Sequence, residues 1–78
     1  MTPSHELQEQ IEKLDLQLLR LLRDRMHLCW DLAGQDGHVP DEETVLFWVE
    51  EAIDQGMDEE IIEKMAKLVA SLCRKSEE

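Results

Sequence analysis

The feature that most constrains this chain is a long apolar stripe in its first half. From Leu7 onward, apolar residues recur at alternating steps of four and three, with one arginine among them: Leu7, Ile11, Leu14, Leu18, Leu21, Arg25, Leu28 and Leu32. This heptad spacing is typical of a helix that packs along a seam. A second stripe runs beside the first one: Asp15, Leu19, Leu22, Met26, Cys29 and Ala33. Two adjacent stripes predict a helix that is covered over a wide arc.

The length of this helix predicts a second copy of the chain. Thr2 can cap the helix, Pro3 suits its first position, and Gly34 with the following Gln-Asp-Gly stretch predicts its end. A helix over 3–34 would be roughly 45 Å long. A compact globule of 78 residues has a radius of gyration of only about 11–12 Å. The helix therefore overshoots its own domain, and we expect an intertwined homodimer.

Two shorter helices are predicted in the second half, over 41–55 and 58–75. Acids follow Pro40 in the first turn of one helix, and Gly56 supplies its end. Asp58 is the expected cap of the last helix. Their apolar faces are Val45, Leu46, Val49, Ala52 and Ile53, and then Ile61, Ile62, Met65, Leu68, Val69, Leu72 and Cys73. No segment has the pattern of a strand, so we predict one all-α domain over 1–78.

Charge and hydropathy exclude several classes of function. The net charge of −11 argues against nucleic-acid binding, which depends on Lys and Arg. No apolar run approaches the roughly 20 residues that span a bilayer, and no signal segment is seen, so we expect a cytoplasmic protein without a membrane partner. Lys and Arg are absent between Met26 and Glu63. This acidic middle is either a solvated face or a docking surface for a basic protein or a cationic ligand.

The cysteines and histidines give no metal or cofactor signature. Cys29 and Cys73 do not have the spacing of a zinc site, and His5, His27 and His38 are scattered. We therefore expect no metal and no cofactor, and we interpret both cysteines as reduced, apolar packing residues. His38, in the predicted loop, is expected to be solvated.

Arg25 interrupts the first stripe, where the other positions are Leu or Ile. A buried guanidinium needs a carboxylate, a ligand or water beside it. Arg25 is therefore either a structural ion pair within the bundle or the cationic floor of an anion-binding pocket. Gln8, Glu43 and Glu77 could line the same cavity.

The stretch from Leu7 to Met26 resembles the first helix of the all-α chorismate mutases. It contains Ile11-x-x-Leu14-Asp15, then a Leu-Leu pair, then a polar residue followed by Arg25. The family pattern is Leu-Arg-x-x-Ile-x-x-Leu-Asp, then Leu-Leu, then an acidic or polar residue and Arg. The long–short–medium order of the helices is similar as well. The resemblance implies an intertwined dimer with two pockets, each mostly within one subunit but with one arginine from the other. Those enzymes rearrange chorismate to prephenate without a covalent intermediate.

Position by position, the resemblance implies catalytic residues at Arg25 and Glu43, which match the family. The family arginine early in the first helix falls on Gln8, the lysine after that helix falls near Asp36, and the arginine that opens the second helix falls on Glu42. A late Gln or Glu falls near Glu77, one turn after Cys73. The implied ligand-binding residues are therefore Gln8, Asp36, Cys73 and Glu77.

The loss of cations at these positions is expected to lower the affinity of the site for a dianion. Two unit charges 4 Å apart interact by about 4 kcal/mol at an effective dielectric of 20, so aspartate in place of lysine turns attraction into repulsion. Our first hypothesis is a chorismate-mutase-like protein whose repurposed pocket takes a neutral, zwitterionic or cationic ligand in a biosynthetic pathway. If it is an enzyme, an isomerase-type reaction without a covalent intermediate is expected. One alternative is a non-catalytic protein that docks through its acidic middle. Another is a weak mutase that Arg74, Lys75 or a partner protein completes.

Overall fold

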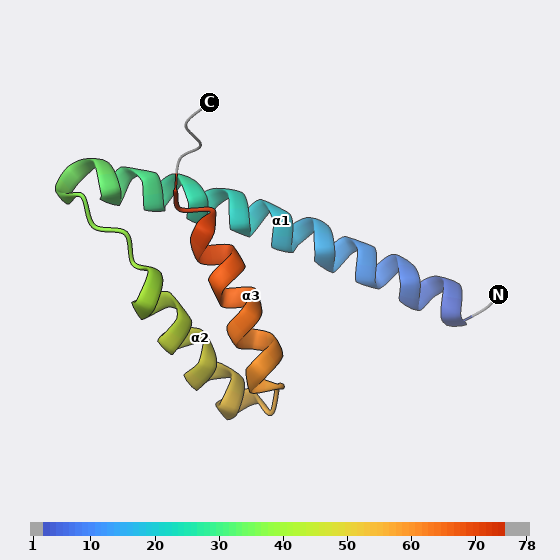
Figure 1. The fold of residues 1–78 in the computed structure, drawn as a ribbon. Helices are drawn as coiled ribbons and strands as arrows, with labels where there is room; N and C mark the ends of the chain where they lie inside the picture. The colour runs from blue at the N-terminus through green and yellow to red at the C-terminus, as the bar shows by residue number, and fades with distance from the viewer. Residues whose placement is uncertain (1–2, 75–78) are drawn as a thin grey trace.

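The computed structural model describes residues 3–74 of the chain. Within this range the chain forms α1 (Pro3–Asp36), α2 (Asp41–Gln55) and α3 (Glu59–Ser71), and no strand (Figure 1). The prediction of an all-α fold is confirmed. Among the described residues, no helix is both long enough and apolar enough to cross a membrane.

The α1 helix is a rod that extends well beyond the rest of the protomer. Its C-terminal half carries α2 and α3, while its N-terminal half projects away from them (Figure 1). The chain measures 53 × 29 × 19 Å and has a radius of gyration of 15.4 Å, above the roughly 11–12 Å of a compact globule. Every residue from 3 to 21 in α1 is exposed. The predicted overshoot of this helix is therefore present.

The end of α1 differs from the sequence-based prediction. The helix continues through Gly34 and ends at Asp36, and Gly37 adopts a φ of 75°. The N–H of Gly37 donates to the carbonyl oxygen of Ala33 at 2.7 Å. Only the second glycine takes the left-handed conformation that terminates helices, because the backbone around Gly34 stays helical.

The α2–α3 hairpin, residues 41–71, turns at Gly56, whose φ is 72°. The Asp58 side chain then accepts a hydrogen bond from the N–H of Ile61 at 3.0 Å. This satisfies one of the free donors at the helix start and confirms the predicted cap. The third helix ends at Ser71, earlier than the predicted 75, and Lys75 lies outside the described residues.

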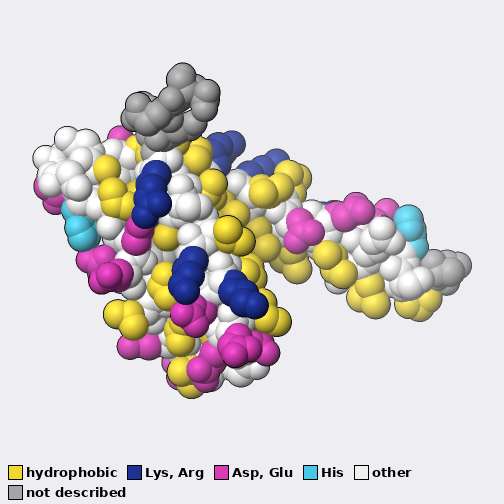
Figure 2. All heavy atoms as spheres, in the orientation of Figure 1, with side chains coloured by type: hydrophobic (Ala, Val, Ile, Leu, Met, Phe, Trp, Pro, Cys, Tyr) yellow, Lys and Arg dark blue, Asp and Glu magenta, His cyan; other side chains and the backbone are white. Residues whose placement is uncertain are grey.

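The core of one protomer is small. The buried apolar residues are Cys29, Ala52, Ile62, Ala66, Val69, Ala70 and Cys73. Other members of the predicted apolar faces remain in solvent: Leu46 is 64% exposed, Ile61 56% and Leu68 71%. Apolar side chains accordingly appear over much of the surface in Figure 2. The chain therefore leaves many large apolar side chains exposed to solvent.

The expectation of two reduced cysteines is wrong in this structure. Cys29 and Cys73 form a disulfide, with their Cα atoms 5.3 Å apart. The two cysteines are 44 positions apart in the sequence, and no sequence pattern predicted their pairing, because the contact depends on how the hairpin folds back on α1. The bond joins Cys73, which follows the α2–α3 hairpin, to the C-terminal half of α1.

Candidate functional site

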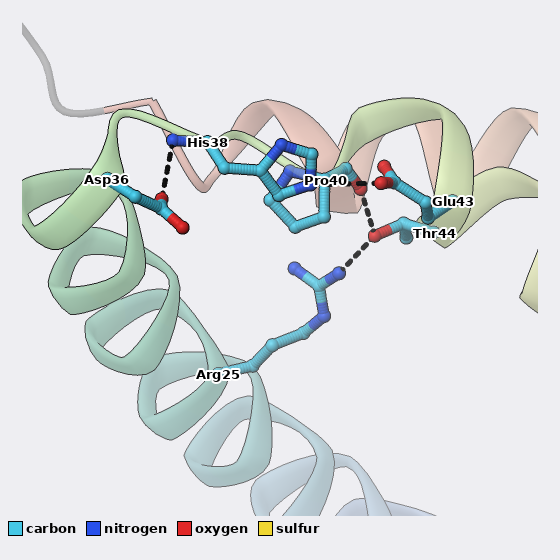
Figure 3. A network of polar contacts seen from close by, with 6 residues as sticks. All are labelled: Arg25, Asp36, His38, Pro40, Glu43 and Thr44. Carbon is cyan, nitrogen blue, oxygen red and sulfur yellow. Dashed lines mark hydrogen bonds and ion pairs between the residues drawn. The ribbon is translucent and has the colours of Figure 1, made fainter.

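Arg25 reaches from α1 to the first turns of α2. Its Nη2 donates a hydrogen bond to Thr44 Oγ1 at 2.6 Å, and Thr44 Oγ1 donates to the carbonyl oxygen of Pro40 at 2.5 Å (Figure 3). The Thr44 hydroxyl is therefore used as both donor and acceptor. Thr44 is buried and Arg25 is half-buried. The two bonds fix the arginine against the start of α2.

No carboxylate neutralises Arg25 within residues 3–74. Its hydrogen-bond partner is a neutral hydroxyl, and no Asp or Glu oxygen of the described chain lies within 4.0 Å of its guanidinium nitrogens. The ion pair with Glu43 that the sequence allowed is not formed in the protomer. A half-buried guanidinium without an acid beside it is suited to bind an anionic group.

Two of the predicted site acids, Asp36 and Glu43, lie on either side of the linker over residues 37–40, which joins α1 to α2. Asp36 Oδ1 accepts a hydrogen bond from the backbone N–H of His38 at 2.9 Å, and His38 Nε2 lies 2.9 Å from Glu43 Oε2. Figure 3 shows Arg25, Asp36, His38 and Glu43 around the same linker. We call the group of Arg25, Asp36, His38, Glu43 and Thr44 the Arg25 cluster. His38 is exposed, as expected, but it contacts Glu43.

The remaining predicted site residues do not join the Arg25 cluster. Gln8 is exposed near the start of α1, and the 17 residues that separate it from Arg25 span about 25 Å of helix. Cys73 is bonded to Cys29 and so presents no free thiol. Glu77 lies outside the described residues. Asp36 and Glu43 therefore both contact His38 beside the helix start that Arg25 reaches, and Gln8 lies apart from them.

A cavity of about 460 Å³ adjoins the linker and the first turns of α2, and is lined by His38, Val39, Asp41, Glu42, Glu43 and Leu46. Acidic side chains and two aliphatic ones make up most of its wall. In residues 3–74, no group of three or more His, Cys, Asp or Glu side chains is placed to hold a metal ion.

Thr44 was missed by sequence reasoning. Its only signal is its position four residues after Pro40 in the first turns of α2, where a threonine hydroxyl can bond back to the carbonyl at i−4. Periodicity alone does not mark a polar residue that is buried for such a bond.

Comparison with family models, with curated proteins and with solved structures gives no match. The resemblance to the helical chorismate mutases therefore rests on the residues quoted in the sequence analysis.

Thr44→Val is expected to destabilise the protein by about 1–3 kcal/mol, because it leaves the half-buried Arg25 without its hydroxyl partner. Urea unfolding followed by circular dichroism measures the change. Thr44→Ser keeps the hydroxyl, so its free energy of unfolding should fall much less. Equal losses for both variants would contradict this expectation, because the methyl group would then contribute as much to stability as the hydrogen bonds of the hydroxyl.

Proposed function

We propose that this protein is a homodimeric, chorismate-mutase-like protein whose Arg25 cluster binds a small zwitterion. The observation that carries the proposal is that half-buried Arg25 is held by a neutral hydroxyl while Asp36 and Glu43 lie at the same linker. Arg25 would bind a carboxylate of the ligand, and the acids would face its ammonium group.

The charges of the cluster favour a zwitterion over a dianion such as chorismate. Arg25 is the one family cation position that this chain keeps, whereas Gln8, Asp36 and Glu42 occupy the others. Each acid that lies within about 4 Å of the ligand's second carboxylate would weaken the binding free energy by up to about 4 kcal/mol at an effective dielectric of 20. The same acids would attract a cationic group. Val39 and Leu46 in the neighbouring cavity suit an apolar ligand body.

A second copy of the chain is part of the proposal. Leu7, Ile11 and Leu14 of α1 are 56, 57 and 58% exposed in the protomer. The first stripe is continuous from these residues to Leu21. A partner helix along it would remove that apolar surface from water. The family resemblance further implies that the second subunit supplies one residue to each pocket.

Binding of three matched probes tests the ligand class. L-phenylalanine carries both charged groups, 3-phenylpropionate lacks the ammonium group, and phenethylamine lacks the carboxylate. Calorimetric titration should show tightest binding for L-phenylalanine and none for it in Arg25→Leu. Arg23→Leu is the matched control, because Arg23 is exposed and pairs with Asp24. Equal affinities for all three probes, or binding that survives Arg25→Leu, would contradict the proposal.

The stability of the same two variants separates a binding role of Arg25 from a scaffolding role. Leucine suits the first stripe, and Thr44 keeps its bond to Pro40 when Arg25 is replaced. Arg25→Leu should therefore preserve or raise the melting temperature while binding is lost. A large loss of stability with binding intact would assign Arg25 to the scaffold.

The purified protein is expected to have little or no chorismate mutase activity, because one arginine cannot hold two carboxylates and stabilise the charge on the breaking ether bond. A chorismate consumption assay with prephenate detection measures this. A turnover number of about 1–10³ per second, the range of ordinary enzymes, would instead support the third hypothesis, in which other cations complete the site.

A non-catalytic docking function is the second candidate. It is favoured by the acids that the hairpin exposes (Figure 2): Glu50, Glu51, Asp54, Asp58, Glu59 and Glu60. A surface of this kind attracts basic partners in a salt-dependent manner. Binding of a polylysine peptide that is lost at high salt, together with no response to the three probes, would favour docking over ligand binding.

A further inference from the structure

The α2–α3 hairpin is attached to α1 at few points. Helices α2 and α3 pack along each other, and no other pair of helices in residues 3–74 shares a comparable interface. The hairpin meets α1 at the end of α3, while the turn at Gly56 lies far from α1 (Figure 1). Besides the linker over 37–40, the attachments between the hairpin side and α1 include the Cys29–Cys73 disulfide and the hydrogen bond from Arg25 to Thr44.

The disulfide lies next to the Arg25 cluster. Cys29 follows Arg25 by four residues, so the two side chains are neighbours on one face of α1. Cys73 comes just after α3, which packs on α2, the helix that carries Thr44. Arg74 also bonds to Asp41 at 2.5 Å and ties the two ends of the hairpin to each other. The bond at Cys73 therefore holds Thr44 within reach of Arg25.

We propose that the Cys29–Cys73 disulfide is a reversible redox clamp that determines whether the hairpin is fixed against α1. In the oxidised chain, the hairpin and the Arg25 cluster are held in the arrangement of this structure. In the reduced chain, the covalent bond is absent, and the hairpin, still joined by the linker and by the hydrogen bond from Arg25 to Thr44, moves relative to α1. The inference does not depend on which ligand the Arg25 cluster binds.

A dithiol is the reductant that the reaction requires. One of its thiolates attacks Cys73 Sγ, the disulfide bond breaks, and Cys29 leaves as a thiolate that takes up a proton. The second thiol of the reductant then displaces Cys73 from the mixed disulfide and closes a cyclic disulfide. Two electrons and two protons pass to the protein, and the dithiol is oxidised.

The structure offers small dithiols a route to the bond. Cys29 and Cys73 are only 6 and 2% exposed, which restricts access by bulky reductants. A cavity of about 520 Å³, lined by Trp30, Asp31, Ala33, Gly34, Val39, Cys73 and Arg74, reaches the second cysteine. Attack is therefore expected at Cys73, on which this cavity opens.

Residual dipolar couplings of the full chain test the clamp, because they report the relative orientation of helices within one molecule. In the oxidised protein, one alignment tensor should fit both the 22–36 part of α1 and the hairpin. After treatment with dithiothreitol, the two parts should require different tensors, with smaller couplings in the hairpin. Removal of the reductant and reoxidation with the cyclic disulfide of dithiothreitol should restore the single tensor.

The double variant Cys29→Ser/Cys73→Ser is the control. It should match the reduced protein and should not respond to dithiothreitol. A single shared tensor in the reduced wild-type protein would overturn the proposal, because the disulfide would then be only a staple in an already rigid body. Global unfolding on reduction, seen as collapse of amide signal dispersion, would overturn it as well.

Discussion

Replacing Leu14 with glutamate is expected to dissociate the proposed homodimer. In a dimer that covers the first stripe, the change removes a buried leucine and places a carboxylate in the apolar interface. A cost of about 3 kcal/mol per subunit, or about 6 kcal/mol per dimer, corresponds to roughly 10⁴-fold weaker association. Sedimentation equilibrium measures the association constant.

Leu16→Glu is the matched control for this prediction. Leu14 and Leu16 are 58 and 50% exposed in a single chain. If the protein were a monomer, the two substitutions should therefore have similar, small effects on its stability. Leu16 lies about 200° around the helix from Leu14 at 100° per residue, outside both stripes. Dissociation should therefore occur for Leu14→Glu and not for Leu16→Glu. A wild-type protein of 9.1 kDa with full helicity would contradict the dimer, because its apolar stripe would be left in water.

Loss of the disulfide is expected to have the second large effect, on stability. The bond closes a loop of 44 residues, and the chain-entropy estimate for that length is about 4 kcal/mol. For a domain of this size, each 1 kcal/mol changes the melting temperature by about 4–8 °C, so reduction should lower it by roughly 15–30 °C. Thermal unfolding with and without dithiothreitol measures the shift.

Two controls make that measurement specific to the disulfide. Cys73→Ser should melt near the reduced wild-type protein and should not change when dithiothreitol is added. All samples need the same protein concentration, because the melting temperature of a dimer depends on it. Identical melting temperatures for oxidised and reduced wild-type protein would mean that the unfolded chain gains little freedom from cleavage of the bond.

The local signals in the sequence were sufficient to predict most of the helix boundaries. Pro3 begins α1, Gly56 ends α2 and Asp58 caps α3, as predicted. These features depend on the conformational preferences of single residues and on hydrogen bonds between near neighbours. The end of α1 was misplaced because two glycines compete there, and only Gly37 takes the left-handed conformation.

The site was harder to predict because its residues are distant in sequence. Arg25 stood out as the one charged residue of the first stripe. In the structure its side chain is half-buried, as its place in an apolar stripe predicts. Its partner Thr44 lies 19 residues away, and neither periodicity nor charge links the two positions. Glu43 was chosen by resemblance, and the structure pairs it with His38 and not with Arg25.

The sequence by itself determined that the chain is helical and that α1 extends beyond the rest of the fold, because heptad spacing and helix rise are local properties. Only the tertiary structure decided which half of α1 carries the hairpin, that Cys73 returns to Cys29, and that a hydroxyl meets Arg25. Each of these contacts depends on the angle at which the linker and the Gly56 turn send the hairpin back. That angle is set by packing between helices, which residue spacing within one helix does not encode.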